Sequence, residues 1–255
     1  MPRQTVLIRG LFRGKYHWGT IPEKLNARFP EREFLCLDIP GAGDRHQERS
    51  PWRIEEMVDS LRAQRVGNEP VDLIAISMGG MIGLNWAERY PNEVSSLFCI
   101  NTTARGFSLF CINTTARGFS PFYQRLRPDN YLNILRALCA PPQRRARIIY
   151  SMVANRPMDD DVIAQWSALE QRLPMQPMNF IRQLAAALRF KAQQPQCRLM
   201  FVSSLHDKLV STLATQALAK AWQSPLILNP QDGHDIPLDN PEWLIEQLVH
   251  WYQQA

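Results

Sequence analysis

Short apolar runs alternate along the chain with longer segments in which apolar residues recur at helical spacing. Several runs, such as TVLI, FLCL and LMFV, are almost continuously apolar, which is typical of parallel strands buried on both faces of a sheet. The alternation predicts an α/β fold with a doubly wound, mainly parallel, six-stranded sheet, whose strands end at a common edge where ligands bind. The predicted strands are 5–9, 33–38, 71–76, 97–101 or its copy, 198–204 and 225–228; the predicted helices lie near 18–28, 51–65, 78–90, 211–222 and 241–253.

Residues 121–196 interrupt this alternation, because they contain several prolines and helical patterns but no convincing strand. The carboxylates of 159–161 are placed to cap the start of one helix. We therefore expect a helical cap inserted over the carboxyl edge of the sheet. The chain then divides into 1–120 and 197–255 as the two parts of the core, with 121–196 as the cap, whose predicted helices are 131–139, 143–154, 160–172 and 177–190.

A tandem duplication lies at the last strand before the cap: LFCINTTARGFS occupies residues 97–108 and again 109–120. Two short identical copies do not make a solenoid, which needs about three longer repeats. Because the repeat has an even length, either copy presents the same side chains to each face of the sheet. We predict that the second copy forms the strand, since this leaves the junction with the cap unchanged.

Ser77 is the candidate nucleophile. It lies in the sequence AISMGG, residues 75–80, directly after a predicted strand and before a predicted helix. This context matches the nucleophile elbow G-x-S-x-G, with Ala75 at the first small position. Small neighbours let strand and helix approach closely, and the helix N-terminus favours developing negative charge. The alternative is a serine in an ordinary strand-to-helix turn, but the context favours a nucleophile.

His234 is the candidate general base, because it follows the last strand on a loop at the same edge of the sheet. Asp207 follows the strand 198–204 and is the candidate acid that orients the histidine. The order Ser77, Asp207, His234 is the one found on hydrolase sheets. A rival position for the acid carries only amides, and Asp235 is interpreted as a loop-stabilising residue. The amides at the rival position are Asn101 and Asn113, and the less well placed histidines are His17, His46 and His250.

An acyl-transfer site also needs N–H donors for an oxyanion. Met78, next to the nucleophile, is the first candidate, and Leu11, after the first strand, is the second, with Phe12 as its alternative. Gly10 permits close approach of the backbone. The sequence shows no metal-ligand cluster and no phosphate-binding glycine loop, so we expect no metal or cofactor.

These motifs resemble the α/β-hydrolase superfamily, and in particular its capped serine esterases. The resemblance rests on LIRGLFRGKYHW, DIPGAGDR, AISMGG, the His-Asp pair at 206–207 and DGHDIPLDNPEW, which occur in order over nearly the whole chain. It implies an α/β-hydrolase core in which Ser77 is the nucleophile, His234 the base and then the acid, and Asp207 its orienting partner. The chain departs from the family in having Arg9-Gly10 where His-Gly is usual, and in lacking the first two strands.

The predicted cap suggests two substrate features. It is rich in methionine and aromatic residues, which fit an apolar acyl pocket, although most of them are expected to form the core of the cap itself. It also concentrates arginine, which fits an acidic carrier such as an acyl carrier protein, or a solvated helix face. The biotin-pathway carboxylesterases are similar in having a basic helical cap. The apolar group is Tyr150, Met152, Met158, Trp166, Met175, Met178 and Phe180; the arginines are 125, 127, 136, 144, 145, 147 and 156.

Composition limits the remaining possibilities. The 255 residues are 45% hydrophobic and 21% charged, which is ordinary for a globular protein. The net charge of +5 is mild and does not indicate nucleic-acid binding. Five cysteines without CxxC spacing do not form a disulfide framework, and no apolar run is long enough to cross a membrane. With no signal-peptide pattern, we expect a cytoplasmic protein.

The sequence as a whole predicts a serine hydrolase that acts on a small-molecule or carrier-bound carboxylic ester, or on a thioester. Two alternatives remain open at this point. One is a non-hydrolytic or C–C-bond-cleaving relative that uses the same triad. The other is a ligand-binding pseudoenzyme whose site the duplication has disabled. The oligomeric state is not predicted.

Overall fold

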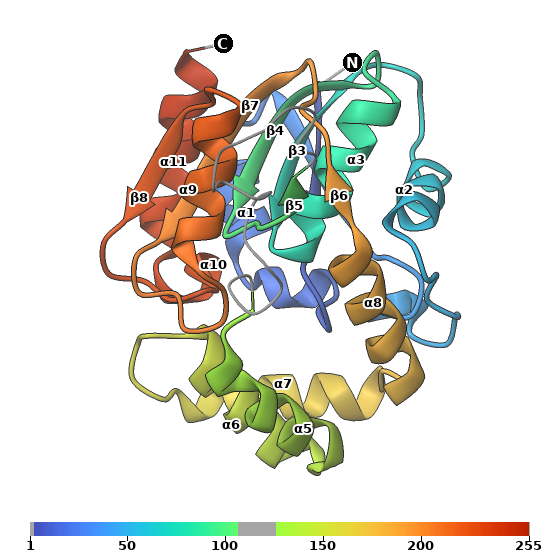
Figure 1. Ribbon diagram of the computed structural model, residues 1–255, viewed down its shortest axis with the longest axis vertical. Coiled ribbons are helices and arrows are strands. Elements are labelled where there is room, and N and C mark those ends of the chain that lie inside the picture. The colour runs from blue at the N-terminus through green and yellow to red at the C-terminus, as the bar shows by residue number, and fades with distance from the viewer. Residues whose placement is uncertain (1–2, 107–125, 255) are drawn as a thin grey trace, which may run out of the picture.

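The computed structural model describes residues 3–106 and 126–254, and its centre is a six-stranded sheet (Figure 1). The strand order is β2-β1-β3-β4-β7-β8, and every pairing is parallel, which confirms the predicted sheet. Parallel pairing directs the carboxyl ends of all six strands to one edge. The strands are β1 (Arg3–Ile8), β2 (Arg32–Leu37), β3 (Val71–Ile76), β4 (Val94–Ile100), β7 (Arg198–Ser204) and β8 (Leu226–Asn229).

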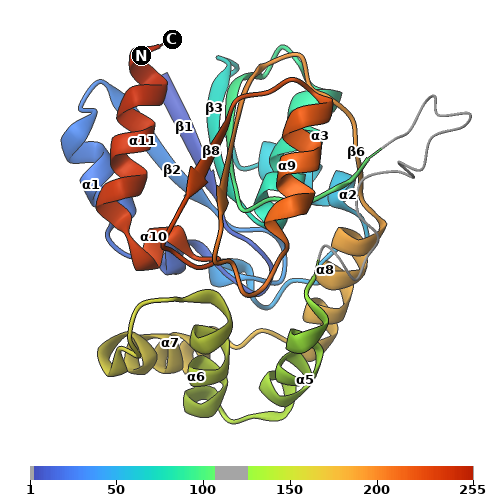
Figure 2. The same cartoon turned by 60° about the vertical axis from the view of Figure 1, so that its left-hand side comes forward.

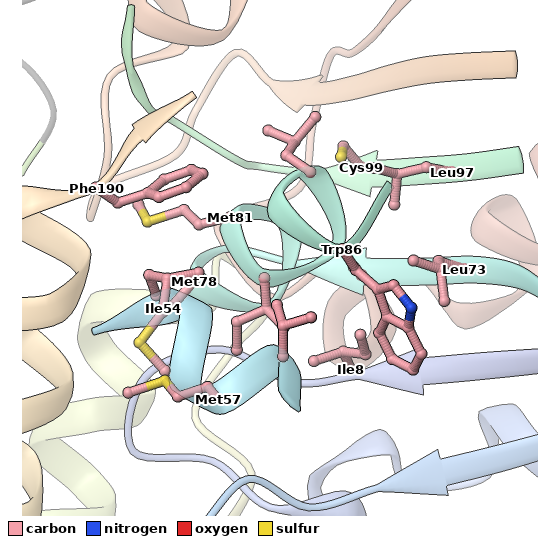
Figure 3. Close-up of a cluster of buried hydrophobic side chains, with 14 of the residues drawn as sticks. Ile8, Ile54, Met57, Leu73, Met78, Met81, Trp86, Leu97, Cys99 and Phe190 are labelled. Atoms are coloured by element: carbon pink, nitrogen blue, oxygen red, sulfur yellow. The ribbon is translucent and has the colours of Figure 1, made fainter. Parts of the chain in front are cut away.

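Helices cover both faces of the sheet, and alternate strand residues point to each. On one face, side chains such as Ile8, Leu73 and Leu97 pack against α2 (Ile54–Arg62) and α3 (Met78–Arg89) (Figure 3). Residues of α9 (Thr212–Ala221) belong to the same cluster. On the other, the neighbouring strand residues Leu7, Ile74 and Phe98 pack against α1 (Ile21–Arg28) and α11 (Pro241–Gln253). The strands are therefore buried on both sides, as their continuous apolar runs predict.

Four further helices form a layer beyond the carboxyl edge of the sheet (Figures 1 and 2). We call α5 to α8 the helical layer. All four predicted helices are confirmed to within a residue, and the Asp159 side chain caps α7 by accepting hydrogen bonds from the N–H groups of Asp161 and Val162. The limits 1–120, 121–196 and 197–255 stay predictions. The layer comprises α5 (Tyr131–Cys139), α6 (Pro142–Val153), α7 (Asp160–Arg172) and α8 (Pro177–Arg189).

The shorter elements escaped prediction. The two-residue strands β5 (Arg105–Gly106) and β6 (Lys191–Ala192) pair in parallel where the chain enters and leaves the region of the layer. Two residues carry no periodic signal, so the pattern that predicts longer strands cannot detect them. The remaining short elements are the 3-10 turns η1 (Lys15–Trp18), η2 (Gly43–Arg45) and η3 (Pro128–Asn130), and the helix α10 (Ile236–Asp239).

The prediction that the second copy of the duplication forms the strand is wrong. The first copy supplies Leu97 to Ile100 of β4, whereas the second copy, 109–120, lies outside the described residues. The reason lies in the residues before the repeat, since β4 begins at Val94, which is buried and pairs with Val71. In the alternative register Gly106 would take the place of Val94, with no side chain to bury.

Candidate active site

Ser77 lies on a strained turn between β3 and α3. Its backbone angles are φ 59° and ψ −122°, a region that a residue with a side chain rarely adopts. The surrounding backbone holds it there, because its N–H donates to the carbonyl of Ile100 at 2.8 Å and its carbonyl accepts from the N–H of Gly80 at 3.0 Å. This is the geometry of the predicted nucleophile elbow.

Glycines around Ser77 are required by close packing. A Cβ atom at Gly79 would lie 2.4 Å from the carbonyl oxygen of Ile8, and one at Gly10 would lie 2.9 Å from the Cβ of Ser77. A Cβ at Gly80 would overlap the side chain of Thr102. The turn that carries Ser77 therefore fits against β1 and the end of β4 only because these positions have no side chain.

His234 and Asp207 form a hydrogen-bonded pair, although 27 positions separate them. Nδ1 of His234 lies 2.7 Å from Oδ2 of Asp207, and both side chains are buried. The other carboxylate oxygen of Asp207 accepts from the N–H groups of Leu209 and Val210 at 2.8 and 2.9 Å. With both oxygens bonded, the carboxylate has one orientation and fixes the plane of the imidazole ring.

Asn101 occupies the rival position for the acid, and the structure gives it a different task. Its Nδ2 donates to the carbonyl of His234 at 2.8 Å and to that of Gly233 at 3.3 Å, while its Oδ1 accepts from the N–H of Ser204 at 2.7 Å. It thereby ties β4 and β7 to the loop of the histidine. Sequence reasoning missed this role; the available signal was an asparagine after a strand, where its positive φ of 46° is tolerated. The copy at Asn113 lies outside the described residues.

Arg9, the residue that departs from the family pattern, forms a buried ion pair with Asp235. Two nitrogens of the guanidinium lie 3.1 and 2.6 Å from the two carboxylate oxygens, and the Arg9 side chain also stacks over Trp18. Burial alone would raise the pKa of the Asp235 carboxyl, but the charge and hydrogen bonds of Arg9 outweigh it and hold that pKa below its usual value. The pair joins the loop after β1 to the loop of His234, so Asp235 stabilises loops as expected.

The two predicted oxyanion donors have N–H groups available. Met78 is the first residue of α3, so its N–H has no acceptor within the helix. Within the described part of the chain, no acceptor is found for the N–H of Leu11. The N–H of Phe12, the alternative, donates to Oε1 of Gln183 at 3.3 Å and is thus engaged. This favours Leu11 over Phe12.

A cavity of about 150 Å³ lies between the sheet edge and the helical layer. Its sheet-edge wall includes Leu11, Ser77, Met78 and His234, so four of the five predicted site residues line one space. The fifth, Asp207, is hydrogen-bonded to His234. Its helical wall is apolar. We define this wall as Ile134, Leu138, Met152, Phe180, Leu184 and Leu188.

The predicted apolar group of the cap divides between two tasks. Met152 and Phe180 belong to the helical wall, whereas Tyr150 and Trp166 pack with Ile163 in a core of the layer itself. Met158 and Met178 are exposed. The arginines also divide: 145, 147 and 156 form ion pairs, 127, 136 and 144 are exposed, and 125 lies outside the described residues.

Two further findings concern only residues 3–106 and 126–254. No group of three or more His, Cys, Asp or Glu side chains is arranged to hold a metal ion. No helix combines the length and the apolar character needed to span a bilayer.

Comparisons with known proteins agree with this arrangement. A family model described as the alpha/beta hydrolase fold matches residues 6–241. The biotin biosynthesis bifunctional protein BioHC of Teredinibacter turnerae is 35% identical over 104 residues, which are 40% of this chain and 18% of that protein. A pimeloyl-[acyl-carrier protein] methyl ester esterase of Neisseria meningitidis serogroup C is 30% identical over 103 residues, 40% of this chain and 38% of that protein.

The matched segments thus span less than two fifths of either relative. A solved esterase of Thermogutta terrifontis superposes with a TM-score of 0.74 at 17% identity, covering 99% of this chain and 90% of that one. That likeness concerns the fold.

Proposed function

Because the chain belongs to the α/β-hydrolase fold family, we propose that it is a serine hydrolase that cleaves a carboxylic ester, or a thioester, through an acyl-enzyme on Ser77. The observation that carries the proposal is the buried hydrogen bond of 2.7 Å between His234 and Asp207, on a cavity that Ser77 also lines. A nucleophile, a base and an orienting acid are the three groups that such catalysis needs.

In the proposed first step, Oγ of Ser77 attacks the acyl carbon while His234 takes its proton. Asp207 keeps Nδ1 of the histidine as the donor, so that Nε2 is the atom that accepts the proton. The N–H groups of Leu11 and Met78 donate to the oxyanion that forms on the carbonyl oxygen. His234 then gives its proton to the departing alcohol or thiol, which leaves the acyl group on Ser77.

In the second step, His234 removes a proton from water, and the resulting hydroxide attacks the acyl-enzyme. The same two N–H groups hold the oxyanion, and His234 returns the proton to Ser77 as the acid leaves. Neither step draws on a metal or cofactor.

The cavity supports an acyl group with an apolar part, since aliphatic and aromatic side chains make up its helical wall. The relatives named above act, by their names, in biotin biosynthesis and on a methyl ester of a pimeloyl group held by an acyl carrier protein. We therefore include carrier-bound acyl esters beside small-molecule esters among the proposed substrates.

The test is hydrolysis of a p-nitrophenyl ester series, from acetyl to dodecanoyl, by the wild-type protein and by Ser77→Ala. We expect turnover by the wild type with an optimum chain length, and none above background for the variant. Equal turnover by both proteins would contradict the proposal, and so would a folded wild type that hydrolyses no ester in the series.

A further inference from the structure

Three charged side chains of the cavity lining take no part in the proposed mechanism: Arg9 and Asp235, which pair with each other, and Arg13, which has no ion-pair partner among the described residues. Arg13 lies on the loop after β1, two residues beyond the proposed oxyanion donor Leu11, and lines the same cavity as Ser77 and His234. It is only 8% exposed. Since consecutive Cα atoms are 3.8 Å apart, the Cα atoms of Leu11 and Arg13 are separated by at most about 7.6 Å.

The guanidinium of Arg13 has an aromatic neighbour but no anion. Its plane lies over the ring of Trp166 from α7, with 3.7 Å between the guanidinium carbon and the ring centroid. Its Nη2 is buried and has no hydrogen-bond partner, and no ion pair to Arg13 occurs among the described residues. A buried polar group without a partner is costly, and more so when it is charged.

The acidic groups nearest to Arg13 are already occupied. Asp235 is held by both terminal nitrogens of Arg9, and Glu170 is paired with Arg145. Each of these two pairs is neutral as a whole, so Arg13 leaves one uncompensated positive charge on this side of the cavity.

The protonation states agree with that charge count. Burial lowers the pKa of Arg13 to about 9; the negative charge of Asp235 opposes this shift, and the positive charge of Arg9 adds to it. The Arg13 side chain therefore stays charged at neutral pH. His17 lies beside Trp166, and burial, together with Arg13 and Arg9, lowers its pKa well below the usual value. His17 is therefore neutral and adds no second cation.

We propose that Arg13 binds a carboxylate of the substrate, and that the protein accordingly acts on monoesters of dicarboxylic acids. A guanidinium offers two parallel N–H groups that match the two oxygens of a carboxylate. Stacking on Trp166 engages the face of the Arg13 guanidinium, while Nη2 at its edge has no hydrogen-bond partner. The apolar helical wall then accommodates the methylene chain between the scissile ester and the carboxylate. This inference rests on the proposed ester hydrolysis and specifies its substrate class.

The experiment compares two esters of equal chain length, p-nitrophenyl hexanoate, which is neutral, and mono-p-nitrophenyl adipate, which carries a carboxylate. We expect the wild type to have the higher kcat/KM for the adipate monoester. In Arg13→Gln the ratio of the two kcat/KM values falls by about tenfold or more, as expected when a charge-assisted hydrogen bond is lost. Arg144→Gln, which changes an exposed arginine on α6, keeps the wild-type ratio. An unchanged ratio in Arg13→Gln overturns the proposal.

Arg13→Lys is a second variant that keeps the proposal testable if Arg13→Gln fails to fold. It retains the charge but loses the planar pair of donors, so its ratio should lie between those of the wild type and Arg13→Gln. If Arg13→Gln does not fold, a lowered ratio in Arg13→Lys supports the proposal and a wild-type ratio contradicts it.

A binding measurement separates this inference from the proposed function. In the Ser77→Ala background, calorimetry should show that adipate binds more tightly than hexanoate and that Arg13→Gln abolishes the difference. Adipate binding that depends on Arg13, in a wild-type protein that hydrolyses neither ester, would refute the hydrolase proposal and retain the carboxylate site. Hydrolysis of both esters, with adipate binding unchanged in Arg13→Gln, would refute the carboxylate site and retain the hydrolase proposal.

Discussion

The two walls of the cavity are built on different principles. On the sheet-edge side, Asp207 with His234 and Arg9 with Asp235 are buried pairs, and Gly79 has no room for a side chain. The helical wall is a set of aliphatic and aromatic side chains from α5, α6 and α8 whose shape alone limits what fits. The sheet-edge wall depends on the exact placement of individual polar atoms, whereas the helical wall depends on the volume that its side chains leave open. Substitutions should therefore have large effects on the first wall and graded ones on the second.

The largest effect is expected at Ser77. Replacing it with alanine removes the proposed nucleophile, and kcat should fall by a factor of about 10⁴ or more. Steady-state ester hydrolysis measures this directly. Ser151→Ala on α6, an exposed serine of the helical layer, is the matched control and should retain wild-type kcat.

Asp207→Asn should rank next, with kcat reduced about 10⁴-fold. The amide keeps the volume but cannot hold His234 in the tautomer and orientation that the base needs. The control is Asp160→Asn, which removes an exposed carboxylate at the start of α7. A variant with more than a tenth of wild-type kcat would show that Asp207 is not the orienting acid.

Substitutions in the ion pair of Arg9 and Asp235 should lower the free energy of unfolding more than they lower the rate of ester hydrolysis. Asp235→Asn leaves the Arg9 charge buried without compensation, and the free energy of unfolding should fall by about 3 kcal/mol. The double variant Arg9→Met with Asp235→Leu removes both charges and should recover most of this loss. Denaturant unfolding curves of Arg9→Met, Asp235→Leu and the double variant measure the coupling. Additive losses would mean that the pair does not act as a unit.

The smallest effect on the reaction is expected from the helical wall. Met152→Ala enlarges the cavity at its helical wall and leaves the residues Ser77 and His234 in place, so the optimum chain length in the p-nitrophenyl series should increase. The kcat/KM for the shortest ester should change by less than about tenfold, since individual apolar contacts discriminate weakly. A loss of activity as large as that of Asp207→Asn would contradict the view that the helical wall limits substrate size without taking part in the reaction.

The same contrast explains what the sequence could predict. The six strands follow from continuous apolar runs, and the turn at Ser77 from its small neighbours, because these signals are local. The partnership of Arg9 and Asp235 joins residues 226 positions apart, and that of Asn101 with the loop of His234 spans 133 positions, so neither has a local signature. The isolation of Arg13 is also invisible in sequence, since it depends on where every nearby carboxylate has already been bound.

The duplication shows where local reasoning fails. The two copies present identical side chains, so the repeat itself could not decide between them. The choice of the first copy depends on Val94, which stands outside the repeat and is buried at the start of β4.

The proposed role of Ser77 is tested most directly by covalent labelling. The wild-type protein and Ser77→Ala are treated with a fluorophosphonate probe, and the modified peptide is identified by mass spectrometry. We expect one adduct per wild-type chain, located on Ser77, and none on the folded variant. A folded wild-type protein that remains unlabelled, or an adduct on another residue that persists in Ser77→Ala, would contradict it.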